Sequence, residues 1–357
     1  MNEDGLTRYV VEQIVNLVRI PSPTGYTQEA VQYLEAELDK LKVGHERTKR
    51  GSLIATLPGR ETGPHRTLAG HVDTLGAMIK EINREGELLL TRVGSYSLNS
   101  VEGEYCTIVT GDGARFRGTI LFEKPSVHVY DSVGTVERKL ENMRIRLDAI
   151  AAGDKGVESL GIRVGDYVHF DPRVELTETG FVKARHLDDK AGVACMLGAI
   201  KAIAESGRKP RLETHFYFST SEEVGFGASA GIPSETAELI AVDMGAVGKG
   251  QKSDEYSVCI CAKDTTGPFD FSLRQRLIQF CRRDGIACKV DVYPFYGSDA
   301  AVAVRAGLDT ITGLIGPGID ASHSLERTHR QALGATVRLI VAYLECEGEL
   351  AHPAGRP

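Results

Sequence analysis

A β-rich stretch from residue 75 to residue 180 interrupts a chain that otherwise alternates apolar strands with helices. The stretch is rich in glycine and charged turns and has no long helical pattern, which favours a small β domain. On either side, the alternation of strand and helix predicts a three-layer, mostly parallel sheet with helices on both faces. We therefore expect an α/β domain from residues 1–74 and 181–348, an inserted β domain at 75–180, and a flexible tail at 349–357.

Apolar periodicity predicts where the elements of the α/β domain lie. A spacing of three and four between apolar residues predicts helices over residues 7–20, 27–42, 189–206, 270–284 and 331–346. Short apolar runs predict strands over residues 53–57, 66–70, 213–219, 239–243, 257–262 and 310–315. With 357 residues, of which 42% are hydrophobic, the chain has enough apolar material for a sizeable core.

Charge and cysteine usage argue against several classes of protein. A formal net charge of -7 does not suit a nucleic-acid-binding face. No run approaches the roughly 18 apolar residues of a membrane span, and the acidic start of the chain does not resemble a secretory signal. Cys259 and Cys261 alternate in an apolar strand and the chain has no CxxC pair, so we interpret both as buried thiols. We expect a cytoplasmic protein with neither a nucleic-acid nor a membrane partner.

Five polar clusters stand where such a fold places its binding sites. In open α/β sheets, ligands bind beyond the carboxyl ends of the strands. Most of the clusters directly follow an apolar run. They are His71-Val72-Asp73, His186-Leu187-Asp188-Asp189, Ser221-Glu222-Glu223-Val224-Gly225, Asp243-Met244-Gly245 and Ser322-His323-Ser324.

Taken singly, most of these clusters have an ordinary explanation. A histidine such as His71 or His323 is most often a surface residue, and His329 competes with His323 nearby. Paired acids at a helix start can cap the helix, and an aspartate after a strand can form a turn. Two adjacent glutamates can end a strand in solvent. Only their common position near strand ends favours a shared function.

Together, the clusters provide a suitable ligand set for two divalent ions, made of His71, His323, Asp243, one acid of the Asp188–Asp189 pair and one acid of the Glu222–Glu223 pair. Three carboxylates and a bridging hydroxide carry four negative charges, which match two divalent cations. Such a pair of ions lowers the pKa of bound water and polarises a carbonyl. A further carboxylate is then needed to move the proton, and the adjacent glutamates at the end of one strand can divide these two tasks.

The motifs HVDT, RHLDDKAG, SEEVG and VDMG and the late SH resemble those of the co-catalytic metallo-aminopeptidases of peptidase family forty-two. This family includes glutamyl and tetrahedral aminopeptidases, and the resemblance covers nearly the whole chain. It implies a zinc-exopeptidase-like fold. It also implies two divalent metal ions per subunit, for which we expect zinc, with cobalt or manganese as alternatives.

The resemblance implies a role for each ligand. By this resemblance, Asp188 bridges the two ions. His71 and Asp243 are the remaining protein ligands of one ion, and Glu223 and His323 are those of the other.

Glu222 matches the general base of the family, and Asp73 matches the acid behind His71. The peptide bond between Asp188 and Asp189 is expected to be cis. The insertion corresponds to a dimerisation domain, from which homo-oligomers up to a twelve-subunit shell assemble.

The chain departs from the family pattern around its late histidine, where Leu325 replaces a common proline. Together with the segments 263–270 and 296–300, this resembles a branch associated with the osmoprotectant N-acetylglutaminylglutamine amide. That compound has a blocked N-terminus, which an ordinary aminopeptidase rejects. Processing of a precursor or of a degradation product would resolve the conflict.

We therefore predict an aminopeptidase that hydrolyses short peptides or related amides by metal-activated water. A deacylase, a carboxypeptidase or a dipeptidase with the same metal site is the alternative, because specificity lies in the pocket. Glycoside hydrolysis is disfavoured, since Glu222 and Glu223 are adjacent and poorly placed to flank a sugar bond. A non-catalytic, metal-stabilised scaffold is the remaining hypothesis.

Overall fold

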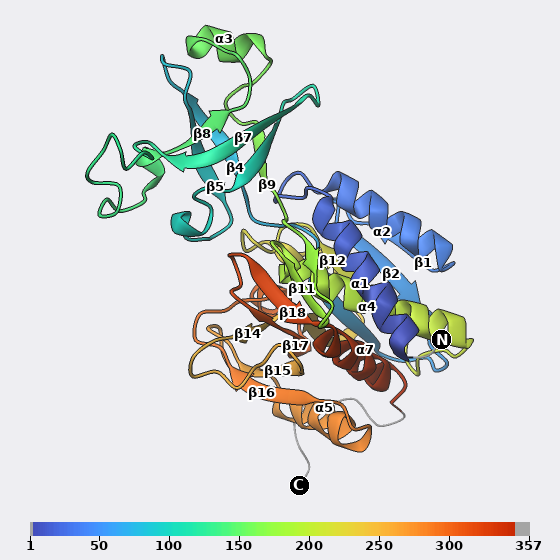
Figure 1. Cartoon of the computed structure of the whole chain (residues 1–357). Coiled ribbons are helices and arrows are strands. Elements are labelled where there is room, and N and C mark those ends of the chain that lie inside the picture. The colour runs from blue at the N-terminus through green and yellow to red at the C-terminus, as the bar shows by residue number, and fades with distance from the viewer. Residues whose placement is uncertain (1–2, 347–357) are drawn as a thin grey trace.

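The computed structural model describes residues 3–346 and contains two separate β structures (Figure 1). One is a 12-stranded mixed sheet with helices on its faces, and the other is a closed barrel. All barrel strands lie between Gly76 and Phe170, in the middle of the chain. The predicted three-layer α/β fold with a small β unit is therefore confirmed, whereas the predicted flexible tail at 349–357 lies outside the described residues.

The five long helices lie close to their predicted positions. Their bounds, with those of two short helices, are α1 (Glu3–Arg19), α2 (Gln28–Lys40), α3 (Gly153–Ser159), α4 (Leu187–Ser206), α5 (Phe271–Arg283), α6 (Asp299–Arg305) and α7 (Arg330–Leu344). The long helices form because apolar side chains recur on one face, and α4 is so apolar that it is buried on nearly all sides.

The large sheet contains all six predicted strands and several shorter ones. Its strands are β1 (Gly44–Arg47), β2 (Leu53–Leu57), β3 (His65–His71), β10 (Glu175–Leu176), β11 (Phe181–Ala184), β12 (Thr214–Ser219), β13 (Thr236–Val242), β14 (Gly245–Val247), β15 (Val258–Lys263), β16 (Cys288–Val292), β17 (Ile311–Asp320) and β18 (Glu326–His329). The additional strands are short or carry many polar residues, so their sequences have little apolar periodicity.

The centre of the large sheet is parallel. Strands β12, β3, β13 and β17 are neighbours in this order and run in one direction. Antiparallel pairs flank them, with β2 beside β12 and β15 beside β17. Because the register pairs Ser219 with His71, the ends of β12 and β3 meet at one edge of the sheet. The polar clusters that follow the central strands are thereby brought together.

The two faces of the sheet carry separate hydrophobic cores. Along β12, Phe216 and Phe218 pack into the core beneath α1, α2, α4, α5 and α7, whereas Tyr217 packs into the core on the opposite face. This alternation follows from the period of two in a β-strand. Helix α6 covers the opposite face, where Ala300 and Ala303 are buried.

The barrel has its own core and lies beside the carboxyl edge of the large sheet (Figure 1). Its strands are β4 (Gly76–Ile82), β5 (Leu88–Val93), β6 (Tyr105–Val109), β7 (Arg115–Phe122), β8 (Met143–Leu147) and β9 (Tyr167–Phe170). The chain enters the barrel directly after the His71 cluster, so the barrel adjoins the site.

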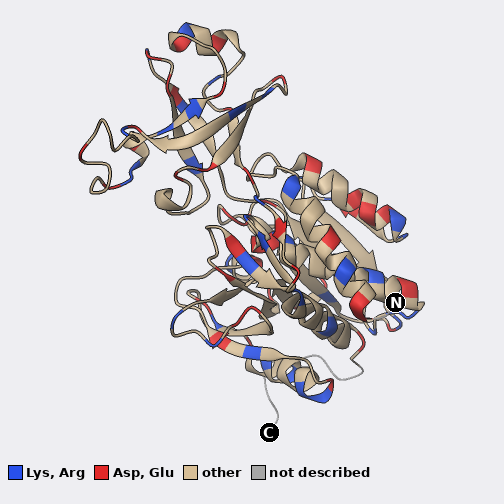
Figure 2. Ribbon diagram, viewed as in Figure 1, with Lys and Arg blue, Asp and Glu red and all other residues tan. Residues whose placement is uncertain are grey.

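Charged residues of both signs are interspersed along the ribbon of both parts of the molecule (Figure 2). Cys259 and Cys261 are both buried, as their alternation in an apolar strand predicts. Within residues 3–346, none of the helices combines the length and the apolar character that a membrane span needs.

Candidate metal centre

His71 is the last residue of β3, and its imidazole is almost fully buried. Its Nδ1 lies 2.9 Å from the backbone carbonyl oxygen of Asp73. Because a carbonyl oxygen can only accept a hydrogen bond, Nδ1 carries a proton. The lone pair of Nε2 is then available to bind a metal ion. Nε2 lies 3.2 Å from Oδ1 of Asp188 and 3.8 Å from Oε2 of Glu222.

Asp188 lies between the two predicted metal-binding histidines. Its Oδ1 faces His71, and its Oδ2 lies 3.4 Å from Nε2 of His323. The hydroxyl of Ser322 donates a hydrogen bond to the same Oδ2 at 3.0 Å. One carboxylate therefore reaches both halves of the cluster, which is the position that a bridging ligand requires.

The neighbouring Asp189 has different partners. Its carboxylate accepts hydrogen bonds from the backbone N–H groups of His71 at 3.1 Å and Gly192 at 3.2 Å. It also has an oxygen within 4.8 Å of donor atoms of His71 and Asp243. Because backbone groups already occupy both of its oxygens, Asp188 is the better placed ligand of the two acids. The peptide bond between Asp188 and Asp189 is cis, as the family resemblance implies.

Glu222 and Glu223 follow β12 and point to different parts of the cluster. Oε2 of Glu223 lies 3.6 Å from Nε2 of His323, whereas Glu222 faces His71. The other oxygen of Glu223 is buried without a hydrogen-bond partner. A buried carboxylate oxygen without a hydrogen bond raises the free energy of the folded state, unless a cation binds it.

The buried carboxylate of Asp73 holds this turn of the chain. It accepts hydrogen bonds from the backbone N–H groups of Glu222 at 3.1 Å and Glu223 at 3.3 Å. The hydroxyl of Thr24 donates a third at 2.6 Å. Asp73 therefore acts on the two glutamates through the backbone, as well as adjoining His71.

Asp243 and His323 complete the predicted ligand set. Asp243 directly follows β13 and is buried, and it accepts a hydrogen bond from the backbone N–H of Met244. His323 adopts a left-handed backbone conformation with φ of 63°. Its Nδ1 contacts the backbone oxygen of Ser95, so the barrel side of the site holds the ring with Nε2 towards Asp188.

The cluster concentrates acidic groups in a buried place. Burial and the nearby charge of Asp188 raise the pKa of Glu223 to about 8 and that of Asp243 to about 7. Burial also raises the pKa of Glu222 well above its usual value. The pKa of Asp188 is lowered, since its hydrogen bonds to His323 and His71 outweigh its burial.

These residues fit divalent cations. The donor set combines imidazole nitrogens with carboxylate oxygens, which zinc and similar ions accept. Mutual repulsion raises the proton affinity of the buried carboxyls, and a divalent cation relieves the same repulsion. The unpartnered oxygen of Glu223 is an independent sign that a cation belongs here.

The competing histidine, His329, faces away from this cluster. Its Nε2 contacts the backbone oxygen of Thr179 at 2.9 Å, and its Nδ1 accepts a hydrogen bond from the backbone N–H of Gln331 at 3.2 Å. Backbone groups of Thr179 and Gln331 therefore contact both ring nitrogens of His329. His323 is the histidine that the fold brings to the cluster.

Sequence reasoning missed Glu326. One oxygen of its buried carboxylate accepts a hydrogen bond from the backbone N–H of Asp188 at 3.1 Å, and the other accepts one from His323 at 3.0 Å. Burial and the charge of Asp188 raise the pKa of Glu326 to about 8. The available signal was its position three residues after His323, where a carboxylate can close a turn onto the histidine's N–H.

The family model described as M42 glutamyl aminopeptidase matches residues 51–339, which include every residue of this cluster. The chain belongs to this family. It is therefore a peptidase of the metal-dependent aminopeptidase type.

Similar proteins agree with this membership. The Bacillus subtilis (strain 168) protein named "Putative aminopeptidase YhfE" is 52% identical over 338 residues, which are 95% of this chain and 98% of that protein. Lysyl aminopeptidase of Pyrococcus furiosus is 23% identical over 220 residues, covering 60% of each chain. The Pyrococcus horikoshii TET1 peptidase has the same fold, with a TM-score of 0.83 at 23% identity, covering 94% of this chain and 99% of that one.

Proposed function

We propose that this protein is a co-catalytic aminopeptidase in which two divalent ions share Asp188. His71 and Asp243 complete the protein ligands of one ion, and Glu223 and His323 complete those of the other. The position of Asp188 carries this proposal, because its two oxygens face His71 at 3.2 Å and His323 at 3.4 Å. When bound, a pair of divalent ions lowers the pKa of water and polarises the carbonyl of the substrate.

In this proposal, Glu222 is the general base. Its carboxylate is on the same side as Nε2 of His71, and its side chain is 15% exposed, compared with 4% for Glu223. Glu222 therefore has access to water and substrate. It takes a proton from the attacking water and gives it to the nitrogen of the leaving amine, so the peptide bond breaks with no net change at the carboxylate.

Asp73 is a positioning residue in the same proposal. Its hydrogen bonds to the N–H groups of Glu222 and Glu223 set the direction in which each side chain leaves the backbone. One residue can then bind a metal while the other stays free for proton transfer.

The metal-free protein reconstituted with zinc, cobalt or manganese tests the substrate class. We expect hydrolysis of short peptides with a free amine and little hydrolysis of acetylated ones. Preference for acetylated substrates would support the deacylase alternative, and release of the C-terminal residue would support the carboxypeptidase alternative. Amidated dipeptides serve as a control for the C-terminus, since an aminopeptidase does not require a free carboxylate there.

We also propose that the protein forms homo-oligomers through its barrel. The Pyrococcus horikoshii TET1 peptidase can assemble into a tetrahedron or a large octahedral shell. The barrel carries exposed apolar side chains, among them Tyr105, Val127 and Val129. Light scattering of the full chain tests this, with dimers or larger assemblies expected.

A cytoplasmic location is part of the proposal. Cys106, Cys195, Cys259, Cys261 and Cys281 are buried thiols that form no disulfide. Free thiols in this number suit a reducing compartment.

A further inference from the structure

A second group of potential metal ligands lies at the opposite end of the central strands. His65 is the first residue of β3, Glu213 directly precedes β12, and His215 is the second residue of β12. Because β3 and β12 are parallel and pair Arg66 with Thr214, these three residues gather at the amino end of the two strands. The cluster around His71 lies at the carboxyl end of β3, about 20 Å away for a strand of this length.

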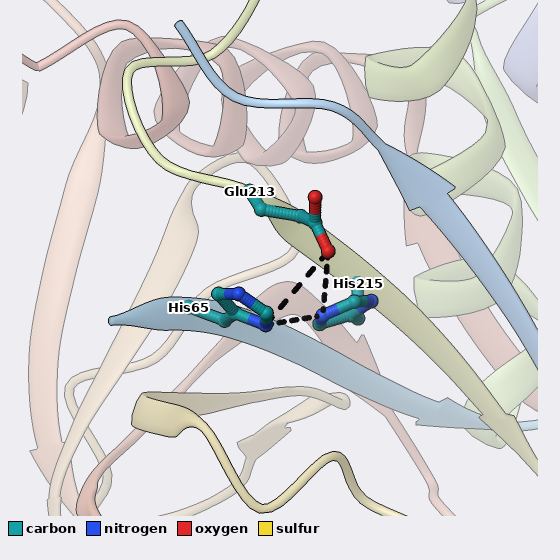
Figure 3. Close-up of side chains that lie close together, drawn as sticks. All are labelled: His65, Glu213 and His215. Carbon is teal, nitrogen blue, oxygen red and sulfur yellow. Dashed lines mark hydrogen bonds and ion pairs between the residues drawn. The ribbon is translucent and has the colours of Figure 1, made fainter. Parts of the chain in front are cut away.

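The three side chains point towards one another (Figure 3). Nδ1 of His65 lies 3.0 Å from Nε2 of His215. Oε1 of Glu213 lies 3.9 Å from Nδ1 of His65 and 3.8 Å from Nε2 of His215. The three donor atoms all lie within 4.8 Å of one another, so one small ion can contact them all.

These distances are close to those of a tetrahedral zinc site. A zinc–nitrogen bond of about 2.0–2.1 Å places two ligand nitrogens roughly 3.3 Å apart in a tetrahedron. The two histidine nitrogens are already near this separation. Glu213 must approach by about half an ångström on the same geometry. Its side chain is 39% exposed and can rotate, whereas that of His215 is 8% exposed and fixed.

A supporting contact orients His215. Its Nδ1 lies 3.0 Å from the hydroxyl of Thr56, which is directly opposite on β2. With the proton on Nδ1, this nitrogen donates to Thr56 and Nε2 is left with its lone pair towards Glu213. Burial and the neighbouring His65 lower the pKa of His215, which keeps the imidazole in the neutral form that binds metals.

We propose that His65, Glu213 and His215 form a further divalent-metal site of the zinc class, separate from the catalytic centre. Two nitrogen donors favour zinc or a similar transition metal over magnesium or calcium, which prefer oxygen. Three protein ligands leave a fourth position on the exposed side of Glu213. An ion here links the amino ends of β3 and β12, the two strands whose carboxyl ends carry the catalytic cluster, and so stabilises the parallel centre of the sheet.

Counting the zinc bound by wild type and by two variants tests this site independently of activity. The full chain is stripped with a chelator, loaded with zinc, freed of excess metal and analysed for zinc per chain. His65→Gln and Glu213→Gln should each hold one zinc fewer than wild type. His45→Gln is the matched control, because His45 faces a single carboxylate, Asp39, at 3.1 Å and should bind the wild-type number.

The expected result is a difference of one zinc ion per chain between wild type and each site variant. This difference does not depend on how many ions the catalytic cluster binds. Equal zinc in wild type and both site variants would overturn the proposal and leave the histidines as a hydrogen-bonded pair. If His65→Gln fails to fold, the exposed Glu213→Gln variant still decides. Anomalous scattering at the zinc edge provides a second readout, with a peak expected among the three side chains and no peak there contradicting the site.

Discussion

Oδ1 of Asp73 accepts a hydrogen bond from the backbone N–H of Glu222 at 3.1 Å, across 149 residues of sequence. The proposed base is thus held by a residue at the end of another strand. Because β3 and β12 end side by side, a change at Asp73 should act on the glutamates even though Asp73 contacts them only through the backbone.

The Asp73→Asn variant tests this positioning. An amide places an N–H₂ group opposite an N–H donor, so at least one hydrogen bond to the turn is lost. Since hydrogen bonds to charged groups contribute about 1.5–3 kcal/mol, kcat should fall at least about 10-fold while KM changes little. Steady-state kinetics of Asp73→Asn measure both constants, with the exposed Asp309→Asn as control. A change confined to KM would contradict the positioning role.

Removal of metal should weaken the fold as well as abolish activity. Without cations, the buried carboxylates of the cluster repel one another or take up protons, whereas bound ions stabilise the folded state by about 3 kcal/mol at a hundredfold excess over Kd. Thermal unfolding of the His65→Gln variant with and without zinc isolates this effect from the proposed further site. An unfolding temperature that does not respond to zinc would be inconsistent with the account.

The buried carboxylate of Glu326 should support metal binding indirectly. It holds the backbone N–H groups of Asp188 and His323, so a Glu326→Gln variant should loosen the proposed bridging ligand and one further ligand of the second ion. Loss of such a supporting group typically weakens metal affinity about 10–100-fold. Calorimetric zinc titration measures this, and the exposed Glu178→Gln variant should keep wild-type affinity. Equal affinity in both variants would show that Glu326 has no such role.

His169 should make the protein sensitive to acid. Burial and the nearby charges of Arg115 and Lys190 lower the pKa of this histidine to about 4, and both ring nitrogens are buried without hydrogen-bond partners. Between pH 6.5 and 4, the unfolded chain binds a proton at this position that the folded chain does not. The stability of the fold is therefore unaffected by His169 above pH 6.5, falls progressively as the pH drops from 6.5 to 4, and changes no further through this residue below pH 4.

The size of this effect follows from the two pKa values, and wild type should lose about 2–3 kcal/mol at pH 4.5 through His169. Urea unfolding at pH 7.5 and 4.5 measures the loss, which should be smaller by that amount in a His169→Phe variant. The exposed His128→Gln variant should behave as wild type. The same acid sensitivity in all three proteins would exclude His169 as the cause.

The long apolar elements could be predicted because their periodicity determines their structure. Strand 53–57 was predicted with its observed bounds, and the predicted helix 189–206 begins only two residues late. The edge strand β16 (Cys288–Val292) is only five residues long and does not follow the usual burial pattern, because Val290 and Val292 are exposed while Asp291 is buried. The short helix α6 (Asp299–Arg305) is fixed by its contacts with the sheet and has too few residues for a helical period.

The site could be predicted only as a set of strand ends. That the strand ends approach each other follows from a parallel sheet, but which of two adjacent acids faces the histidines depends on local backbone geometry. Asp188 and Asp189 are equivalent in sequence, and the structure distinguishes them by their partners. The cluster of His65, Glu213 and His215 was missed because it depends on the register between β3 and β12, which periodicity does not reveal.

The most direct measurement of the central claim is the turnover and metal content of Glu222→Gln. Glutamine keeps the size of the side chain but cannot accept the proton of water, so we expect wild-type metal content with turnover reduced about 10²–10⁴-fold. The exposed Glu12→Gln variant should match wild type in both. Full metal content with nearly wild-type turnover would contradict Glu222 as the base, and loss of metal would show that it is a ligand instead.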